Sequence, residues 1–262
     1  MPVRVATWNV NSIRQRLPHL TDWLRNAAPD VVCLQEIKCV DDAFPTADIE
    51  ALGYNVAVHG QKTFNGVAIL SKHPFDEVRA RLPGDEADEQ ARYLEAVIST
   101  SSGALRIASI YLPNGNPVGS EKYPYKLKWM DRLKAHAAAL LAHEEPFVLA
   151  GDYNIIPQPE DAKNPAEWVS DALFLLQSRA KFRELVALGL TEAFRACDAA
   201  PGHYTFWDYQ GGGWQRDNGI RIDHLLLSPQ AASRLKGCVI DKAMRGREKA
   251  SDHVPIRCDL AI

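Results

Sequence analysis

The sequence predicts an α/β protein of the α+β kind, a four-layer α/β sandwich in which two stacked mixed β-sheets are flanked by helices. Two observations favour this fold. Strand-like runs rich in Val, Ile, Leu and Ala outnumber the helical segments. The helical segments also lie between groups of strands, which fits stacked sheets better than a strictly alternating parallel fold. No boundary or repeat divides the chain, so we expect one domain spanning residues 1–262.

The predicted strands are apolar runs bounded by Gly, Pro, Asn or Asp. Some are apolar throughout, which is typical of strands buried on both faces. Residues 104–112 alternate instead, with Leu105 and Ile107 on one face and Arg106 and Ala108 on the other. In chain order the predicted strands cover residues 3–8, 30–35, 54–59, 66–71, 92–99, 104–112, 146–152, 221–228 and 254–260.

Three segments have helical spacing of apolar residues. The first begins near Leu17 and is closed by Pro29. The second covers residues 121–143, where Met130 and Leu133 belong to an apolar stripe. The third is predicted between about Glu167 and Leu188.

Composition indicates an ordinary globular chain: 46% of its 262 residues are hydrophobic and 24% are charged. We find no signal peptide and no membrane-spanning stretch. The five cysteines show no CxxC spacing, so we expect a reducing, cytoplasmic compartment of the bacterial type, with action at the nucleoid, and no structural zinc. The net charge of −3 does not by itself favour nucleic-acid binding, although catalytic carboxylates would offset a basic rim.

Polar side chains recur where predicted strands begin or end. Carboxylates and amides beside apolar runs cost free energy unless they are paired or bind a cation. One such residue would be an ordinary buried polar group, but the strand ends together would form a single polar pocket. These residues are Asn9, Asn11, Gln35, Glu36, Lys38, Tyr111, Asn114, Asp152, Asn154, Asp223, His224, Asp252 and His253.

The donor chemistry of this set favours a hard cation. Oxygen ligands without a Cys or His cluster suit Mg²⁺, with Mn²⁺ as a substitute, better than zinc. Carboxylates that do not bind the ion can activate water or orient a histidine. The sequence therefore predicts metal-assisted hydrolysis of a phosphate ester.

The same motifs resemble those of the exonuclease III class of apurinic/apyrimidinic (AP) endonucleases, within the endonuclease/exonuclease/phosphatase superfamily that includes deoxyribonuclease I. The resemblance runs from about Val3 to Pro255. It rests on the ordered motifs "WNVNSIR", "LQEIK", "GYNVAVHGQK", "GVAILS", "YLPNG", "GDYN", "GIRIDHLLLS" and "SDHVPI".

The resemblance implies a deoxyribonuclease I-like fold and a DNA-repair nuclease. Its substrate would be double-stranded DNA, cut 5′ to an abasic site, with 3′–5′ exonuclease and 3′-end-cleaning activity. Mg²⁺ would be the cofactor, and we expect a monomer that does not bind membranes. One alternative is a phosphatase or phosphodiesterase of the same superfamily that acts on a non-DNA ester. Another is a DNA-binding module with an inactive site.

The resemblance also implies residue roles. Glu36 matches the main metal ligand, with Asn9 and Asp252 completing or supporting the site. Asp152 matches the residue that aligns or deprotonates the attacking water, and Asn154 matches its orienting neighbour.

Further roles concern the phosphate. His253 resembles a histidine that contacts the scissile phosphate and is held by Asp223. Tyr111 matches a tyrosine of phosphate contact or leaving-group help, and Asn114 a phosphate-side donor. His224 is predicted as a packing residue.

Two more residues are predicted on the substrate side. Asn11 would contact substrate, with a metal-side or turn position as alternatives. Lys38 would contact phosphate, with a solvated lysine as the alternative.

The segment 203–223 interleaves aromatic residues with arginines, which suits stacking around an unstacked nucleotide. Phe206, Trp214 and Arg221 are its predicted substrate contacts, and Trp207 is predicted in the core. The run Gly211 to Gly213 is interpreted as a flexible loop that lets Trp214 or Arg216 reach DNA. Other candidate phosphate contacts are Arg14, Arg16, Lys62, Lys122, Lys126, Arg245, Arg247 and Lys249.

Overall fold

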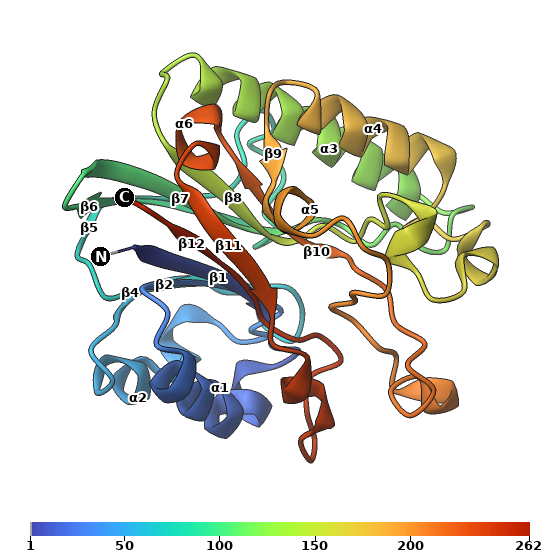
Figure 1. Ribbon diagram of the computed structural model, residues 1–262, viewed down its shortest axis with the longest axis horizontal. Helices are drawn as coiled ribbons and strands as arrows, with labels where there is room; N and C mark the ends of the chain where they lie inside the picture. The colour runs from blue at the N-terminus through green and yellow to red at the C-terminus, as the bar shows by residue number, and fades with distance from the viewer. Residues whose placement is uncertain (1) are drawn as a thin grey trace.

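Two six-stranded β-sheets stack face to face in the computed structural model, which describes residues 2–262 (Figure 1). The order in the first sheet is β11-β12-β1-β2-β4-β3, and in the second β5-β6-β7-β8-β10-β9. Each sheet is mixed, because β1 runs parallel to β2 and β7 parallel to β8 while the remaining neighbours are antiparallel.

The strands are short and follow the apolar runs of the sequence. Those of the first sheet are β1 (Val3–Asn9), β2 (Val31–Gln35), β3 (Asn55–His59), β4 (Val67–Ser71), β11 (Leu235–Ile240) and β12 (Ile256–Leu260). Those of the second are β5 (Phe75–Ala80), β6 (Tyr93–Thr100), β7 (Gly103–Tyr111), β8 (Phe147–Asp152), β9 (Thr191–Glu192) and β10 (Asp223–Leu227).

Helices cover the outer faces of the stack (Figure 1). The first sheet is covered by α1 (Ile13–Ala27) and α2 (Thr46–Glu50), and the second by α3 (Lys122–Leu141) and α4 (Leu176–Val186). Two shorter helices, α5 (Ala193–Cys197) and α6 (Pro229–Ala232), precede and follow β10 in the chain. Single 3₁₀ turns lie at Asp41–Ala43, Pro159–Asp161, Pro165–Trp168, Gln210–Gly212 and Lys242–Gly246.

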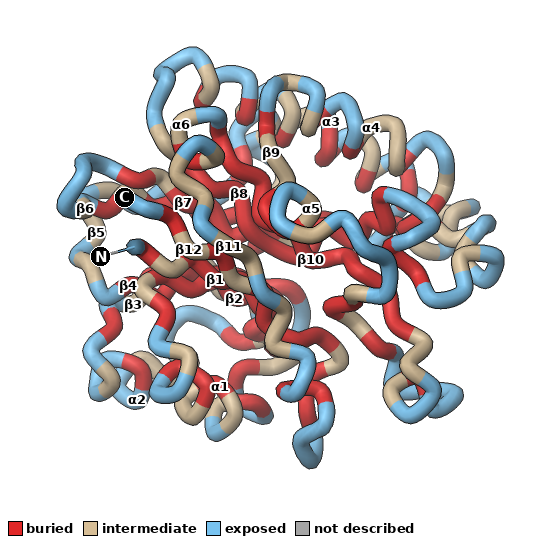
Figure 2. Tube along the Cα trace, in the orientation of Figure 1, coloured by how far each residue is buried: buried red, intermediate tan, exposed pale blue. Residues whose placement is uncertain are grey.

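Strand alternation divides the core into layers, and buried chain runs through the middle of the stack (Figure 2). Val5 and Ile69 of the first sheet join Leu105 and Ile107 of the second in the cluster between the sheets. Side chains of opposite parity face the helices, so Ala108 belongs to a separate cluster beneath α3 and α4. The alternation predicted for residues 104–112 is therefore confirmed, and with it the four-layer sandwich.

Three strands were not predicted, β5, β9 and β11. All three lie at sheet edges, β9 has only two residues, and β5 and β11 carry exposed polar residues. An edge strand is buried on less of its surface, so its hydrophobic pattern is weaker than that of a central strand. The third predicted helix is also shorter than expected, because α4 begins at Leu176 and Pro165–Trp168 forms a 3₁₀ turn instead.

Within residues 2–262, the helices are all too short or too polar to cross a membrane.

A buried carboxylate fastens α3 to the second sheet. Glu95 on β6 is 2% exposed and accepts hydrogen bonds from Tyr93 and Arg106, each at 2.5 Å. His136 of α3 places its Nε2 at 2.8 Å from the same carboxylate. Burial acts to raise the pKa of Glu95, but His136, Tyr93 and Arg106 outweigh it and lower the pKa to about 2.

We expect Glu95→Gln to lower the free energy of unfolding by about 3 kcal/mol at pH 7, because a pKa depressed by this much reflects that much stabilisation of the carboxylate. The folded pKa lies below the ordinary value of 4.5, so the difference between the proteins should be complete above pH 4.5 and shrink as the pH falls toward 2. Urea unfolding between pH 7 and pH 3 measures it. Glu184→Gln, on an exposed face of α4, should change little. Equal stability of Glu95→Gln and the parent at pH 7 would contradict the assignment.

Candidate active site at the joined strand ends

Strand pairing places three predicted residues in one row across the second sheet. Tyr111 at the end of β7 is the register partner of Asp152 at the end of β8. Asp152 is in turn the partner of Asp223, the first residue of the antiparallel β10. Asn9 ends β1 in the facing sheet, and Glu36 follows β2 directly. The two parallel strand pairs therefore deliver their polar ends to the same rim of the stack.

The side chain of Asn9 joins the two sheets at this rim. Its amide nitrogen donates to Glu36 Oε1 at 2.7 Å and to Asp152 Oδ2 at 2.9 Å. Its amide oxygen accepts the Asn11 N–H at 3.0 Å. Asn9 was predicted to complete or support the metal site, and here its nitrogen supports two carboxylates while its oxygen faces its own loop.

Glu36, Asp152 and His253 form a cradle of cation size. One ligand atom from each lies within 4.8 Å of the others, and among residues 2–262 no other group of three or more His, Cys, Asp or Glu side chains meets that condition. Two carboxylates suit a hard divalent cation. Burial acts to raise the pKa of Glu36, but Lys38 and Asn9 outweigh it and lower the pKa, so the carboxylate is held ionised.

His253 lies between two carboxylates. Its Nδ1 is 2.9 Å from Asp223 Oδ2, and its Nε2 is 3.7 Å from Asp152 Oδ2. Burial acts to lower the pKa of His253, but Asp223 and Asp152 outweigh it and raise the pKa to about 10. The charged form of His253 is favoured, and as an imidazolium it can donate to a phosphate oxygen.

Asp152 is held from two directions. Oδ2 accepts from Asn9, and Oδ1 accepts the backbone N–H of Asn154 at 2.9 Å. Burial raises the pKa of Asp152, and the neighbouring His253 opposes that rise. Such a carboxylate is oriented and basic, as a group that takes a proton from water must be.

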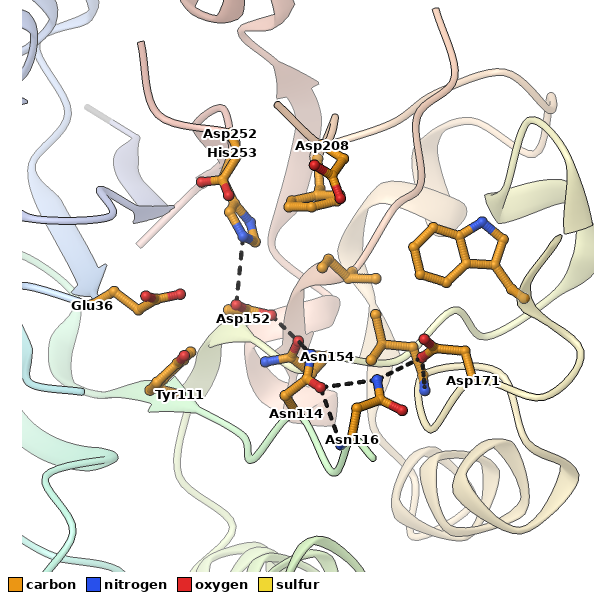
Figure 3. Close-up of a pocket in the computed structure, with 14 residues that line it drawn as sticks. Glu36, Tyr111, Asn114, Asn116, Asp152, Asn154, Asp171, Asp208, Asp252 and His253 are labelled. Carbon is orange, nitrogen blue, oxygen red and sulfur yellow. Dashed lines mark hydrogen bonds and ion pairs between the residues drawn. The ribbon is translucent and has the colours of Figure 1, made fainter. Parts of the chain in front are cut away.

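Tyr111 completes the row on the far side of Asp152 from Asp223. Figure 3 shows its side chain on the Glu36 side of Asp152. Burial and the adjacent Glu36 and Asp152 carboxylates raise the pKa of Tyr111 well above its ordinary value, so the phenol remains a donor. The Arg92 guanidinium lies 4.8 Å from the centre of its ring and holds the ring in place.

A chain of amides extends the site along its lower edge (Figure 3). Asn114 donates to Asn154 Oδ1 at 3.1 Å, and Asn154 donates to the Leu112 carbonyl at 2.9 Å. Asn116 donates to Asn114 Oδ1 at 2.9 Å and to Asp171 at 3.0 Å. The orientation of each amide is fixed by the next, so Asn114 and Asn154 present defined atoms to the site.

These groups border a cavity of about 280 Å³. The predicted Phe206 is in its wall, with its ring centre 5.0 Å from that of His253. Sequence reasoning missed the other wall residues, Asn116, Trp168, Asp171, Leu173, Asp208 and Ile222. Asn116 follows the same strand as Asn114, so the pattern of polar residues after strand ends could have predicted it. Residues 165–173 follow no predicted strand, so that pattern could not identify Trp168, Asp171 or Leu173.

The backbone is strained where the site residues leave their strands. Asn11, Glu36, Lys38 and Asn154 all have φ between 43° and 54°. Residues other than glycine rarely adopt this left-handed conformation, which is typical of functional sites. The turn at Glu36 directs the carboxylate toward Asn9 rather than along the strand.

Asn11 and Lys38 lie beside the site but are bound to other side chains. Lys38 Nζ is 2.8 Å from Glu36 Oε2 and donates to Asn11 Oδ1 at 2.5 Å. Asn11 donates to Asp252 at 3.0 Å. Asp252 lines the cavity but is not one of the three residues of the cradle. The prediction that Glu36 and Asp252 converge on one rim therefore holds, with Asp252 in a supporting position.

The prediction that Arg221 contacts substrate is wrong for this structure. Arg221 is 1% exposed, and its guanidinium pairs with Asp161 at 2.9 Å and Glu192 at 3.0 Å. The prediction rested on an arginine among aromatic residues in segment 203–223. That pattern was misleading because buried ion-pair networks and DNA contacts both use arginine. His224 is buried beside Arg221, as expected for a packing residue.

Trp214 also differs from its prediction. Its ring packs edge-on against the fully buried Trp207 with centres 5.2 Å apart, so it belongs to the apolar cluster under α1 rather than to a free loop. Three of the candidate phosphate contacts are buried and bonded within the protein, namely Arg16, Lys126 and Arg245. The exposed ones are Arg14, Lys62, Lys122, Arg247 and Lys249, together with Arg216.

Comparison with known proteins agrees with this arrangement. The model of the family described as "Endonuclease/Exonuclease/phosphatase family" matches residues 6–253. Exodeoxyribonuclease III of Haemophilus influenzae is 34% identical over 262 residues, which cover 97% of this chain and 98% of that protein.

Two solved structures are similar over nearly the whole chain. An AP endonuclease from Archaeoglobus fulgidus superposes with a TM-score of 0.94 at 34% identity, covering 99% of this chain and 100% of that one. The 3′ phosphatase NExo from Neisseria, bound to a product DNA hairpin, superposes with a TM-score of 0.94 at 35% identity and the same coverage.

The geometry predicts how the charge of His253 responds to its neighbours. In Asp223→Asn the carboxylate that lies closest to the ring is neutral, so the pKa of His253 should fall by at least one unit. Histidine side-chain ¹⁵N spectra recorded against pH follow it, with the exposed His143 as an internal reference. The parent imidazolium should persist above pH 8. An unchanged titration of His253 in the variant would show that Asp223 does not stabilise the charge.

Proposed function

The chain belongs to the endonuclease/exonuclease/phosphatase family, and we propose that it is a DNA-repair nuclease that hydrolyses the phosphodiester 5′ to an abasic site in duplex DNA. The resemblance to the exonuclease III class and the assignment as a phosphodiester hydrolase are confirmed by the relatives. The similar Neisseria protein is a 3′ phosphatase, which supports an additional action on blocked 3′ ends, and the similar exodeoxyribonuclease III supports action on 3′-terminal nucleotides.

The observation that carries the proposal is the cradle of Glu36, Asp152 and His253 beside a cavity of about 280 Å³. An attacked phosphodiester gains negative charge on its non-bridging oxygens. The cradle supplies the ionised Glu36 carboxylate for a cation, the Asp152 carboxylate for the attacking water, and the His253 imidazolium for those oxygens. The cavity adjoins them and has a partly apolar wall, which suits a sugar that carries no base.

The metal site fits a hard divalent cation, and we propose Mg²⁺, with Mn²⁺ as a substitute. Glu36 is the side chain that would hold the ion, with Asp252 nearby, because its carboxylate is kept ionised at the rim. Bound there, the ion would stabilise phosphate charge as a Lewis acid.

The residues of the chain itself are assigned complementary roles. Asp152 aligns the attacking water and accepts its proton, since it is held by Asn9 and by the Asn154 N–H. His253 donates from Nε2 to a phosphate oxygen while Asp223 holds its Nδ1–H. Tyr111 and Asn114 donate to oxygens on the other side of the phosphate, and Tyr111 stays protonated for this task.

Duplex DNA is the proposed partner, and we propose that the protein acts as a monomer. Exposed basic side chains such as Arg14, Lys62 and Lys122 would meet backbone phosphates and make binding weaken with salt. A reducing, cytoplasmic setting is proposed because all five cysteines are free thiols.

The test offers the protein a labelled duplex with one tetrahydrofuran abasic analogue, with Mg²⁺ or with EDTA. We expect metal-dependent incision 5′ to the analogue, and a loss of about 1,000-fold in Asp152→Asn, because the variant can neither take a proton nor orient water as a carboxylate does. Asp42→Asn, an exposed acid outside the site, is the matched control and should cleave as the parent does.

Equal incision by Asp152→Asn and the parent would remove Asp152 from the mechanism. A parent protein that ignores the abasic duplex and instead hydrolyses inositol phosphates or sphingomyelin would overturn the proposed substrate. A second duplex that ends in a 3′-phosphate measures the end-cleaning activity in the same experiment.

A further inference from the structure

A buried lysine lies directly beneath the amide edge of the site. Lys126 on α3 is 0% exposed, yet no Asp or Glu within residues 2–262 forms an ion pair with it. Its Nζ donates instead to two main-chain carbonyls, that of Asn114 at 2.9 Å and that of Asn154 at 2.6 Å. Burying an ammonium costs several kcal/mol, so a lysine retained here indicates that these two bonds matter.

The two carbonyls belong to Asn114 and Asn154, two of the three asparagines that line the cavity. Asn114 follows β7, Asn154 follows β8, and their side chains are bonded to each other at 3.1 Å. The lysine therefore closes a ring of main chain and side chain that ties the loop after β7 to the loop after β8. The same ring reaches Asp152, because the Asn154 N–H donates to its Oδ1.

Packing around the lysine stem shows that the loop after β7 is built against it. Gly115 has φ of 91°, and a Cβ at this position would lie 2.7 Å from Lys126 Cδ. The same Cβ would also crowd Ala172 at 3.1 Å and Tyr123 at 3.3 Å. Only a glycine allows the loop to pack this closely against the aliphatic part of the Lys126 side chain. This packing is a second, independent observation that the loop is shaped around Lys126.

Burial lowers the pKa of Lys126 to about 7, with Asp152 and Asp171 opposing the fall. The N–H groups of the side chain donate to the two carbonyls in either protonation state. The bridge therefore does not depend on a full positive charge.

We propose that Lys126 is a positioning residue that holds the Asn114 and Asn154 amides, and through them Asp152, in register with the phosphate. This inference rests on the proposed function. Lys126 touches no reacting atom. It fixes the positions of the loops after β7 and β8, which carry Asn114 and Asn154. Without it, two buried carbonyls lose their partner and the loops shift to find another. A displacement on the order of 1 Å at a catalytic group costs about 100-fold in rate.

The test compares Lys126→Met with Lys128→Met, an exposed lysine two positions further along α3. With the abasic duplex and Mg²⁺, we expect Lys126→Met to lower kcat by about 10- to 100-fold with KM within about twofold, because the DNA surface is untouched. Lys128→Met should match the parent. A folded Lys126→Met variant with the parent's kcat would overturn the proposal.

A double-mutant comparison separates positioning from mere stability. In a background with both Asn114→Ala and Asn154→Ala, the side-chain amides that Lys126 positions are gone, so adding Lys126→Met should cost several-fold less in single-turnover rate than it does in the parent background. The loss that remains is the part transmitted to Asp152 through the Asn154 backbone N–H, which the alanine variants keep. The same fold-loss in both backgrounds would contradict action through the asparagines.

Lys126→Gln keeps a side-chain donor for one carbonyl and guards against a methionine variant that fails to fold. Its kcat should lie between those of the parent and Lys126→Met, and circular dichroism checks that each variant is folded. A glutamine variant no better than methionine, with equal folding, would count against the bridge. The parent rate on abasic duplex tests the proposed function separately, since its absence would reject that function whatever the lysine variants do.

Discussion

The site depends on one interaction, the pair of hydrogen bonds from the Asn9 amide to Glu36 and Asp152. These two carboxylates come from different sheets, and each is buried or nearly so at the rim where the sheets meet. Like charges at such proximity would separate the strand ends. One neutral amide with two donors satisfies both, and its own oxygen is held by the Asn11 backbone. The spacing of the carboxylates is therefore set by the fold.

Positive groups balance the remaining charge in a defined order around the rim. Lys38 neutralises the outer oxygen of Glu36, and His253 lies between Asp152 and Asp223. Lys38 helps to hold the Glu36 carboxylate ionised, which burial alone would oppose. Glu36 and Asp152 both line the cavity, where a divalent cation and a phosphate can bind side by side.

The sequence predicted those features in which strand periodicity and strand-end polarity act together. The apolar run before Asp152 placed that residue at a buried strand end, and the matching run before Glu36 did the same in the other sheet. The convergence of both was inferred, and the structure has it. Arg221 and Trp214 were misassigned, since a charged or aromatic residue near a site looks the same in sequence whether it faces solvent or its own core.

Other features lie beyond any local pattern. The cavity wall at Trp168 and Leu173 comes from irregular chain between β8 and α4, whose path is set by tertiary contacts. Lys126 lies on the apolar stripe side of a helix, where composition predicts a surface charge, and only the positions of the Asn114 and Asn154 carbonyls reveal its partner. The edge strands β5, β9 and β11 were not predicted, because half-exposed strands need few apolar residues.

The central claim is that Glu36 and Asp152, held apart by Asn9, create one cation site beside one water position. Anomalous diffraction at the manganese edge from crystals grown with Mn²⁺ tests it most directly. The account predicts a single strong peak about 2 Å from a Glu36 carboxylate oxygen, on the cavity side of the Asn9 amide. A map with manganese bound elsewhere and none at Glu36 would contradict it.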